Sequence, residues 1–102
     1  MSTYIIAYHG GKKPESPEEG AKHMKKWQEW IKNLGDNVVN PGTPLGSSKI
    51  VSSEGVSDIT GPDRLTGFAM VKAVSLDAAI EIAKTDPFLT MGNVEIAEVF
   101  NM

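Results

Sequence analysis

Hydrophobic residues follow two spacings along this chain, and the change between them predicts the order of its elements. Residues 3–9 form a run of β-branched, aromatic and small apolar residues that ends at Gly10, and residues 65–74 form a second such run. Runs that are apolar on both faces are typical of the central strands of a sheet. Residues 94–100 instead alternate apolar and polar positions, which indicates a strand with one covered face.

Two segments between these strands have helical spacing. Ser16 and Pro17 suit the N-cap and the first position of a helix that Gly35 would end. Over residues 17–34, a rotation of about 100° per residue gathers the apolar side chains and one histidine in a stripe roughly 120° wide. The stripe consists of Gly20, His23, Met24, Trp27, Trp30, Ile31 and Leu34. A second, shorter helix is predicted to begin after Ser75.

The segment after the first helix is rich in turn-forming residues. Residues 37–48 contain Pro41, Gly42, Pro44 and Gly46, so we predict an irregular loop with at most a short extended piece at residues 38–39. Residues 48–53 then predict a short edge strand. The predicted order of elements is therefore β-α-β-β-α-β.

This order is that of the split β-α-β, or ferredoxin-like, motif. We predict an α+β fold with a four-stranded antiparallel sheet, whose first and third strands are central, in a single domain over residues 1–102. Two helices can cover only one face of such a sheet. Because the central strands are apolar on both faces, we expect a second copy of the chain to cover the other face. The result would be a homodimer with its sheets packed face to face.

Composition narrows the classes of function. The chain contains no cysteine, which excludes disulfides, thiolate metal ligands and a cysteine nucleophile. Its formal net charge of -3 argues against a nucleic-acid partner, because binding phosphates needs a basic surface. No apolar run approaches the roughly 18 residues that a membrane span needs, and residues 1–7 do not have the pattern of a leader. We therefore expect a cytoplasmic protein with no membrane partner.

His23 stands out in the helical stripe because it is titratable. It is either a packed core histidine or part of a pocket for a small molecule, whose walls would include the neighbouring Trp27 and Trp30. Tyr8 and His9, at the end of the first strand, are the other candidates for lining such a pocket. The sequence thus offers one candidate site and two interpretations of it.

Several short motifs occur in an order that is similar to that of a known family. They are Ala21-Lys22-His23-Met24-Lys25-Lys26-Trp27, Leu34-Gly35, Pro41-Gly42-Thr43-Pro44-Leu45-Gly46, Gly67-Phe68, Leu76-Asp77-Ala78-Ala79, Asp86-Pro87-Phe88 and Val94-Glu95-Ile96. With this set the chain resembles the YCII-related proteins, including their DGPF-domain branch, over nearly its whole length. The resemblance implies dimeric α/β barrels of ferredoxin-like subunits, with some members acting in dehalogenation or lactone chemistry. It also implies an active-site pair at His23 and Asp86.

The chain departs from the DGPF branch in one segment. Where an Asp-Gly-Pro-Phe tetrad is expected, the sequence reads Asp58-Ile59-Thr60-Gly61-Pro62-Asp63. The role of that tetrad therefore does not carry over to this chain.

The implied pair suits acid–base chemistry. The carboxylate can accept a hydrogen bond from one ring nitrogen of the histidine, fix its tautomer, and leave the other nitrogen to act as base or acid. The implied function is that of a small cofactor-independent enzyme acting on a small organic molecule. The alternative is a non-catalytic module with the same dimeric fold, which binds a small ligand or a regulatory partner.

Motifs for metals and cofactors do not help to decide between the enzyme and the binding module. His9, His23 and Asp86 would satisfy the count for a site of two histidines and one carboxylate, but they belong to different elements and have no motif spacing. The sequence also contains no phosphate-binding loop, no dinucleotide-binding glycine motif and no nucleophile elbow. We predict neither a metal nor a cofactor.

Overall fold

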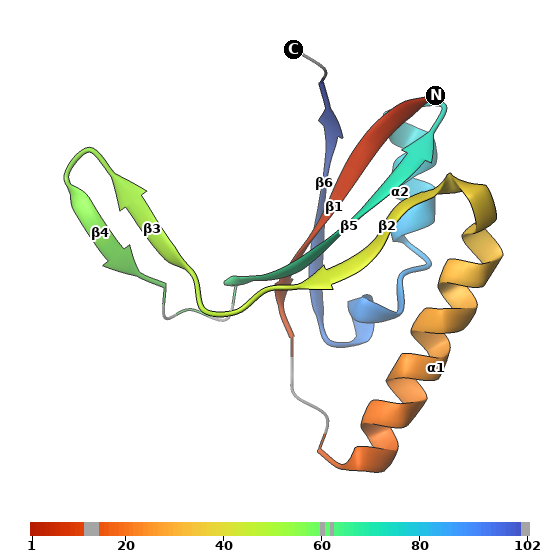
Figure 1. Ribbon diagram of the computed structural model, residues 1–102, viewed down its shortest axis with the longest axis horizontal. Coiled ribbons are helices and arrows are strands. Elements are labelled where there is room, and N and C mark those ends of the chain that lie inside the picture. The colour runs from red at the N-terminus through yellow and green to blue at the C-terminus, as the bar shows by residue number, and fades with distance from the viewer. Residues whose placement is uncertain (12–14, 60, 62, 101–102) are drawn as a thin grey trace.

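The computed structural model describes residues 1–11, 15–59, 61 and 63–100, and one antiparallel sheet lies at its centre (Figure 1). The sheet has the strand order β2-β5-β1-β6. Its strands are β1 (Ser2–Gly10), β2 (Val38–Pro44), β5 (Leu65–Ala73) and β6 (Gly92–Val99). The prediction that the two doubly apolar runs form the central strands is confirmed, since β5 and β1 lie between β2 and β6.

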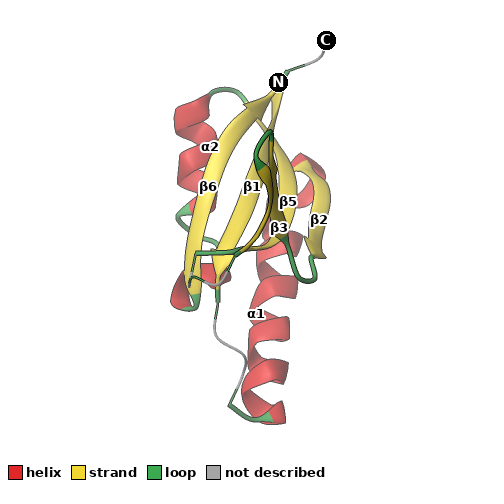
Figure 2. Cartoon of the chain, turned by 90° about the vertical axis from the view of Figure 1, so that its left-hand side faces the viewer, coloured by secondary structure: helices red, strands yellow, loops and turns green. Residues whose placement is uncertain are grey.

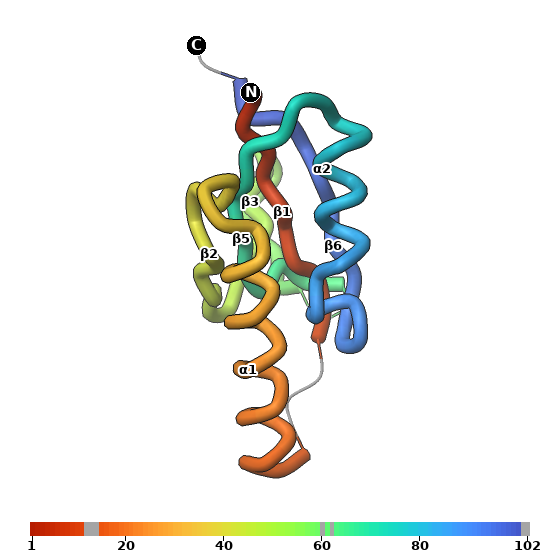
Figure 3. Tube along the Cα trace, turned by 90° about the vertical axis from the view of Figure 1, so that its right-hand side faces the viewer, coloured from red at the N-terminus to blue at the C-terminus, as the bar shows by residue number. Residues whose placement is uncertain are grey.

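Two helices cover one face of the sheet, as Figures 2 and 3 show from opposite sides. The helical segments are α1 (Pro17–Leu34), α2 (Leu76–Ala83) and the short 3-10 helices η1 (Gly35–Asn37) and η2 (Pro87–Thr90). Both long helices begin at their predicted caps: the Ser16 side chain accepts a hydrogen bond from the Glu19 N–H, and the Ser75 side chain accepts one from the Ala78 N–H. The α+β, ferredoxin-like architecture predicted from the sequence is confirmed.

The edge strand β2 is where the structure departs from the prediction. Residues 38–44, expected to be irregular, pair with β5 through register shifts on both sides of Asn40. An edge strand tolerates proline because its outer edge has no neighbouring strand that needs an N–H donor. A β-bulge accommodates an extra residue on one strand of a pair. Gly42, with a φ of 140°, lies inside the second register shift. The loop prediction is wrong because proline and glycine shape this edge strand instead of preventing it.

The segment predicted as an edge strand belongs to a separate hairpin. Lys49–Ser52 form β3, which pairs only with β4 (Gly55–Asp58) among the described residues. The hairpin projects from the side of the sheet opposite to the helices (Figure 1). Residues 60 and 62, in the segment where the family tetrad is expected, lie outside the described residues.

The core lies between the sheet and the helices. Tyr4, Ile6 and Tyr8 of β1 alternate with side chains that point to the other face, and all three are buried. On β5 the buried positions are Gly67, Ala69, Val71 and Ala73, which lie beside them in register. Trp30 of α1 and Ala79 of α2 pack against these strand residues from the helical side and complete the core. Small residues on β5 thus leave room for the large side chains of β1.

The second face of the sheet is apolar at its centre but carries no helix. Ile5 and Ala7 of β1 pair with Met70 and Phe68 of β5 there, and each is only partly buried. No described helix lies over this face (Figure 2), and neither strand of the hairpin packs closely against β1 or β5. The homodimer expected from the sequence remains a prediction. Within the described part of the chain, no helix is long and apolar enough to cross a membrane.

Candidate functional site

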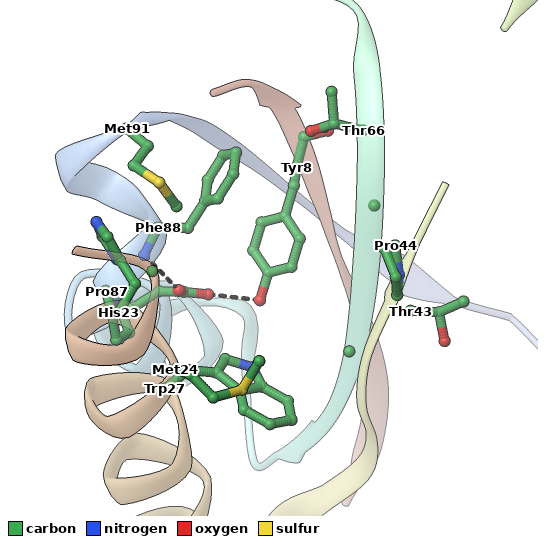
Figure 4. A pocket seen from close by; sticks show the side chains of 14 residues that line it. Tyr8, His23, Met24, Trp27, Thr43, Pro44, Thr66, Pro87, Phe88 and Met91 are labelled. Carbon is green, nitrogen blue, oxygen red and sulfur yellow. Dashed lines mark hydrogen bonds between the residues drawn. The ribbon is translucent and has the colours of Figure 1, made fainter. Parts of the chain in front are cut away.

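A cavity of about 400 Å³ lies between the first half of α1 and one end of the sheet. It forms because only the second half of α1 packs on the core, where Trp27, Trp30, Ile31 and Leu34 make contact. The cavity is walled by side chains from α1, the ends of β2 and β5, and the turn after α2 (Figure 4). They include Tyr8, His23, Met24, Trp27, Pro44, Thr66, Asp86, Phe88 and Met91. The walls are mostly apolar with a few polar groups, as in many small-molecule sites.

Asp86 is the polar centre of this cavity. It lies directly before η2, where it acts as N-cap, and its Oδ1 accepts a hydrogen bond of 2.9 Å from the Phe88 N–H. Its Oδ2 accepts a second one of 2.6 Å from the Tyr8 hydroxyl. The side chain is almost fully buried, with 4% of its surface exposed. Pro87, fixed at the first position of η2, helps to hold this geometry.

Tyr8 reaches Asp86 across the end of the sheet. It stands opposite Gly67 on β5, and a Cβ on Gly67 would lie 3.4 Å from the tyrosine ring and 3.0 Å from the Thr43 carbonyl oxygen. The absence of a side chain there lets the phenol ring lie close to the strand. On its other side the ring packs against Phe88, with ring centroids 4.7 Å apart (Figure 4). Tyr8 is therefore held with its hydroxyl on the carboxyl group.

Burial dominates the protonation of this pair. It raises the pKa of Asp86, and the hydrogen bonds from Tyr8 and the Phe88 N–H lower the pKa by less. Burial also raises the pKa of Tyr8, and the neighbouring Asp86 raises it further. Tyr8 thus remains a neutral hydrogen-bond donor, while the Asp86 carboxyl keeps its proton to a higher pH than an exposed aspartate.

The raised pKa of Asp86 predicts how stability responds to pH. In the unfolded chain this carboxyl ionises near its ordinary pKa of about 3.9, so the contribution of Asp86 to stability is full below that pH. The contribution is lost as the pH rises through the higher pKa of the folded state. Asp86→Asn cannot ionise. The melting temperature of the wild type minus that of the variant should therefore fall from about pH 4 to about pH 7. Calorimetry across this range would contradict the assignment if the difference rose.

His23 enters the same cavity from α1. It is partly buried, and no described residue makes a hydrogen bond to its imidazole. In particular, no hydrogen bond joins it to Asp86, whose oxygens are engaged by Tyr8 and the Phe88 N–H. The structure therefore brings His23 and Asp86 to one cavity without pairing them directly.

The remaining candidates divide between the cavity and other places. Trp27 lines the cavity, and its indole N–H donates a hydrogen bond of 3.1 Å to the Pro41 carbonyl on β2. Trp30 does not line it: this side chain is buried in the core and donates to the Thr85 hydroxyl at 2.8 Å. His9 is also outside, on the face of the sheet away from the helices, where its Nε2 lies 2.9 Å from Glu95. Alternation along β1 separates His9 from Tyr8.

The sequence did not single out the residues that complete the walls. Phe88 and Met91 follow Asp86 in a turn, and Pro44 belongs to the segment expected to be a loop. Met24 could have been found, because it lies beside His23 in the apolar stripe of the helix. Among the described residues, no group of three or more histidine, aspartate or glutamate side chains could hold a metal ion.

Comparison with solved structures relates the fold to that of an enzyme. One similar structure is 5-chloro-2-hydroxyhydroquinone dehydrochlorinase from Burkholderia phenoliruptrix AC1100, in complex with 2,5-dihydroxybenzoquinone. The match has a TM-score of 0.60 and 16% identity, and it covers 98% of this chain and 95% of that one. This likeness supports the ferredoxin-like fold. No curated protein sequence matches the chain.

Comparison with family models is more direct. The model of the YCII-related domain matches residues 1–102, the whole length of the sequence. The resemblance in the ordered motifs is thereby confirmed, and the chain belongs to the family of YCII-related domain proteins.

Proposed function

We propose that this protein is a small enzyme that catalyses proton transfer on a small hydroxylated ring compound, with His23 and Asp86 as its acid–base groups. The observation that carries the proposal is that both side chains enter one mostly apolar cavity of about 400 Å³. A volume of this size falls in the range typical of small-molecule sites, about 300 to 1,000 Å³. The apolar walls suit a ring, and the polar groups suit its hydroxyls.

The geometry favours two separate groups in one cavity over a hydrogen-bonded histidine–aspartate dyad. Tyr8 and the Phe88 N–H hold Asp86 in place, while the His23 imidazole has no partner among the described residues. Asp86 has a raised pKa, so it suits the role of an acid that gives a proton. His23 suits the role of the base that receives one.

Loss of HCl from a chlorinated hydroquinone illustrates the chemistry and supplies a test reaction. Protonated Asp86 gives its proton to the ring carbon that carries chlorine, while His23 takes the proton of a ring hydroxyl. The carboxylate then takes the proton of a second hydroxyl, whose O–H electron pair forms a carbonyl as chloride leaves with the C–Cl pair. The products are a quinone and HCl, and no oxidant is consumed. The proposal draws this reaction class from the structurally similar dehydrochlorinase.

Binding and turnover can be measured with the compounds of that enzyme. The chain contains two tryptophans, so Trp30→Phe leaves Trp27 in the cavity as the only indole. Titration of this variant with 2,5-dihydroxybenzoquinone should quench its fluorescence in a saturable way. Wild-type protein should release chloride from 5-chloro-2-hydroxyhydroquinone faster than buffer does.

Three outcomes separate the alternatives. Binding with turnover supports the proposed enzyme. Binding without turnover, for this and for brominated and unhalogenated hydroquinones, overturns the enzyme and leaves a small-ligand-binding module. The absence of both overturns the proposal for this class of compounds.

A further inference from the structure

The β3–β4 hairpin is the most exposed part of the described chain. All eight of its strand residues are exposed. They include Ile50, Val51 and Val56, which expose 54%, 76% and 64% of their surface. A two-stranded hairpin with no further packing is at best marginally stable in water. Three exposed aliphatic side chains on such a hairpin therefore indicate that something else covers it.

The two faces of the hairpin differ. Val51 stands opposite Val56, and on the same face Lys49 forms an ion pair of 2.7 Å with Asp58. The other face carries Ile50 opposite Ser57. The valine face thus combines an apolar pair with charges that neutralise each other, so it offers a contact surface without net charge.

The whole molecule exposes more surface than a compact protein of its size. Its accessible surface is 7336 Å² at a mass of 11.0 kDa, whereas folded monomers of that mass expose about 5,600 Å². Its radius of gyration of 14.8 Å also exceeds the roughly 13 Å expected for a compact chain of this length. The excess area of about 1,700 Å² is more than the approximately 800 Å² per partner that a stable interface buries. The area thus suits an extensive interface.

The hairpin and the uncovered face of the sheet lie on the same side of the molecule. Figures 1 and 2 show the hairpin rising from the end of the sheet, in front of the face that the helices leave open. The alternation of buried positions along β1 and β5 places Ile5, Ala7, Phe68 and Met70 on that face. A partner packed on that face would lie in the angle between the sheet and the hairpin. The two surfaces can thus be covered by one partner.

We propose that the β3–β4 hairpin is an arm that holds a second copy of this chain against the open face of the sheet, with the Val51–Val56 face in contact with that copy. A second copy fits because a two-fold arrangement covers both apolar sheet faces with each other and both arms at once. The chain is acidic overall, with a net charge of -3, and the internal Lys49–Asp58 pair keeps the Val51–Val56 face of the arm from adding repulsion. This inference concerns assembly and does not depend on the proposed reaction.

The arm can be tested by two substitutions that place the same charge on neighbouring residues of β4. In analytical ultracentrifugation the wild type should be a dimer at micromolar concentration. Val56→Lys should raise the dimer dissociation constant about 100-fold or more, because the lost apolar contact occurs twice per dimer. Ser57→Lys, on the opposite face, should change it far less. Both residues are exposed in the single chain, so neither substitution should lower the melting temperature of the sheet.

Thiol labelling reports on the arm without disturbing its charge. The chain has no cysteine, so Val51→Cys introduces a single reactive site. Its labelling by a maleimide should slow markedly above the dimer dissociation constant, whereas Lys22→Cys on the exposed side of α1 should label at the same rate throughout. A monomeric wild type at micromolar concentration would overturn the assembly. A dimer that Val56→Lys leaves intact, with the introduced thiol equally reactive at all concentrations, would overturn the arm alone.

Discussion

His23→Gln is expected to lower the kcat of chloride release by about 10² to 10⁴, the range that general acid–base groups contribute. Glutamine has a similar reach and polarity but cannot accept a proton, so binding of 2,5-dihydroxybenzoquinone should change little. The melting temperature should also be nearly unchanged, because His23 lines a cavity and makes no hydrogen bond to a described residue. The measurements are steady-state kinetics, Trp27 fluorescence and thermal unfolding.

Asp86 provides the matched control for this substitution. If the two groups act on one substrate, Asp86→Asn should reduce kcat to a similar extent, and the double variant should lose little more than either single one. A large fall in melting temperature for His23→Gln with retained turnover would show that the histidine serves packing. That result would remove it from the mechanism.

Trp30→Ala is expected to cost about 3 to 5 kcal/mol of unfolding free energy, the usual range for a large aromatic in a core. Only 6% of the Trp30 surface is exposed, and the truncation would also leave the Thr85 hydroxyl without the indole donor that reaches it at 2.8 Å. For a domain this small, such a loss is a large part of the total stability. Urea unfolding followed by circular dichroism measures it directly.

Trp27 is the control for this prediction, one helical turn away. It is only partly buried and lines the cavity, so Trp27→Ala should cost clearly less stability than Trp30→Ala. It should instead weaken the binding of 2,5-dihydroxybenzoquinone, as measured by isothermal titration calorimetry, because this variant lacks the fluorescent probe. Equal losses of stability for the two variants would contradict the division between a core tryptophan and a cavity tryptophan.

Local sequence signals were sufficient for most of the sheet and both helices. The doubly apolar runs on β1 and β5, and the serine caps of α1 and α2, depend only on neighbouring residues. Strand β2 could not be found in this way. Its pairing with β5 is a contact between distant segments, and the register shifts that accommodate Pro41 and Gly42 have no local signature.

The site was predictable to the extent that a helix face and a family motif define it. The helical stripe placed His23 and Trp27 on one surface, and the Asp-Pro-Phe motif supplied Asp86. The Tyr8–Asp86 hydrogen bond joins residues 78 positions apart, so only the fold reveals it. Trp30 shares the apolar stripe of His23 but does not line the cavity. It lies where α1 packs on the core, and the last cavity residue of the helix is Trp27, one turn before it.

Helix α1 has two different roles along its length, because only its second half packs on the core. Its second half carries the contacts that keep the domain folded, whereas Gly20, His23 and Met24 in its first half face the cavity outside the core. Substitutions at Gly20 and Met24 should therefore cost little folding stability, whereas His23 is tied to the proposed reaction. The shape of the cavity can thus be altered through the first half of the helix while the half that packs on the core stays the same.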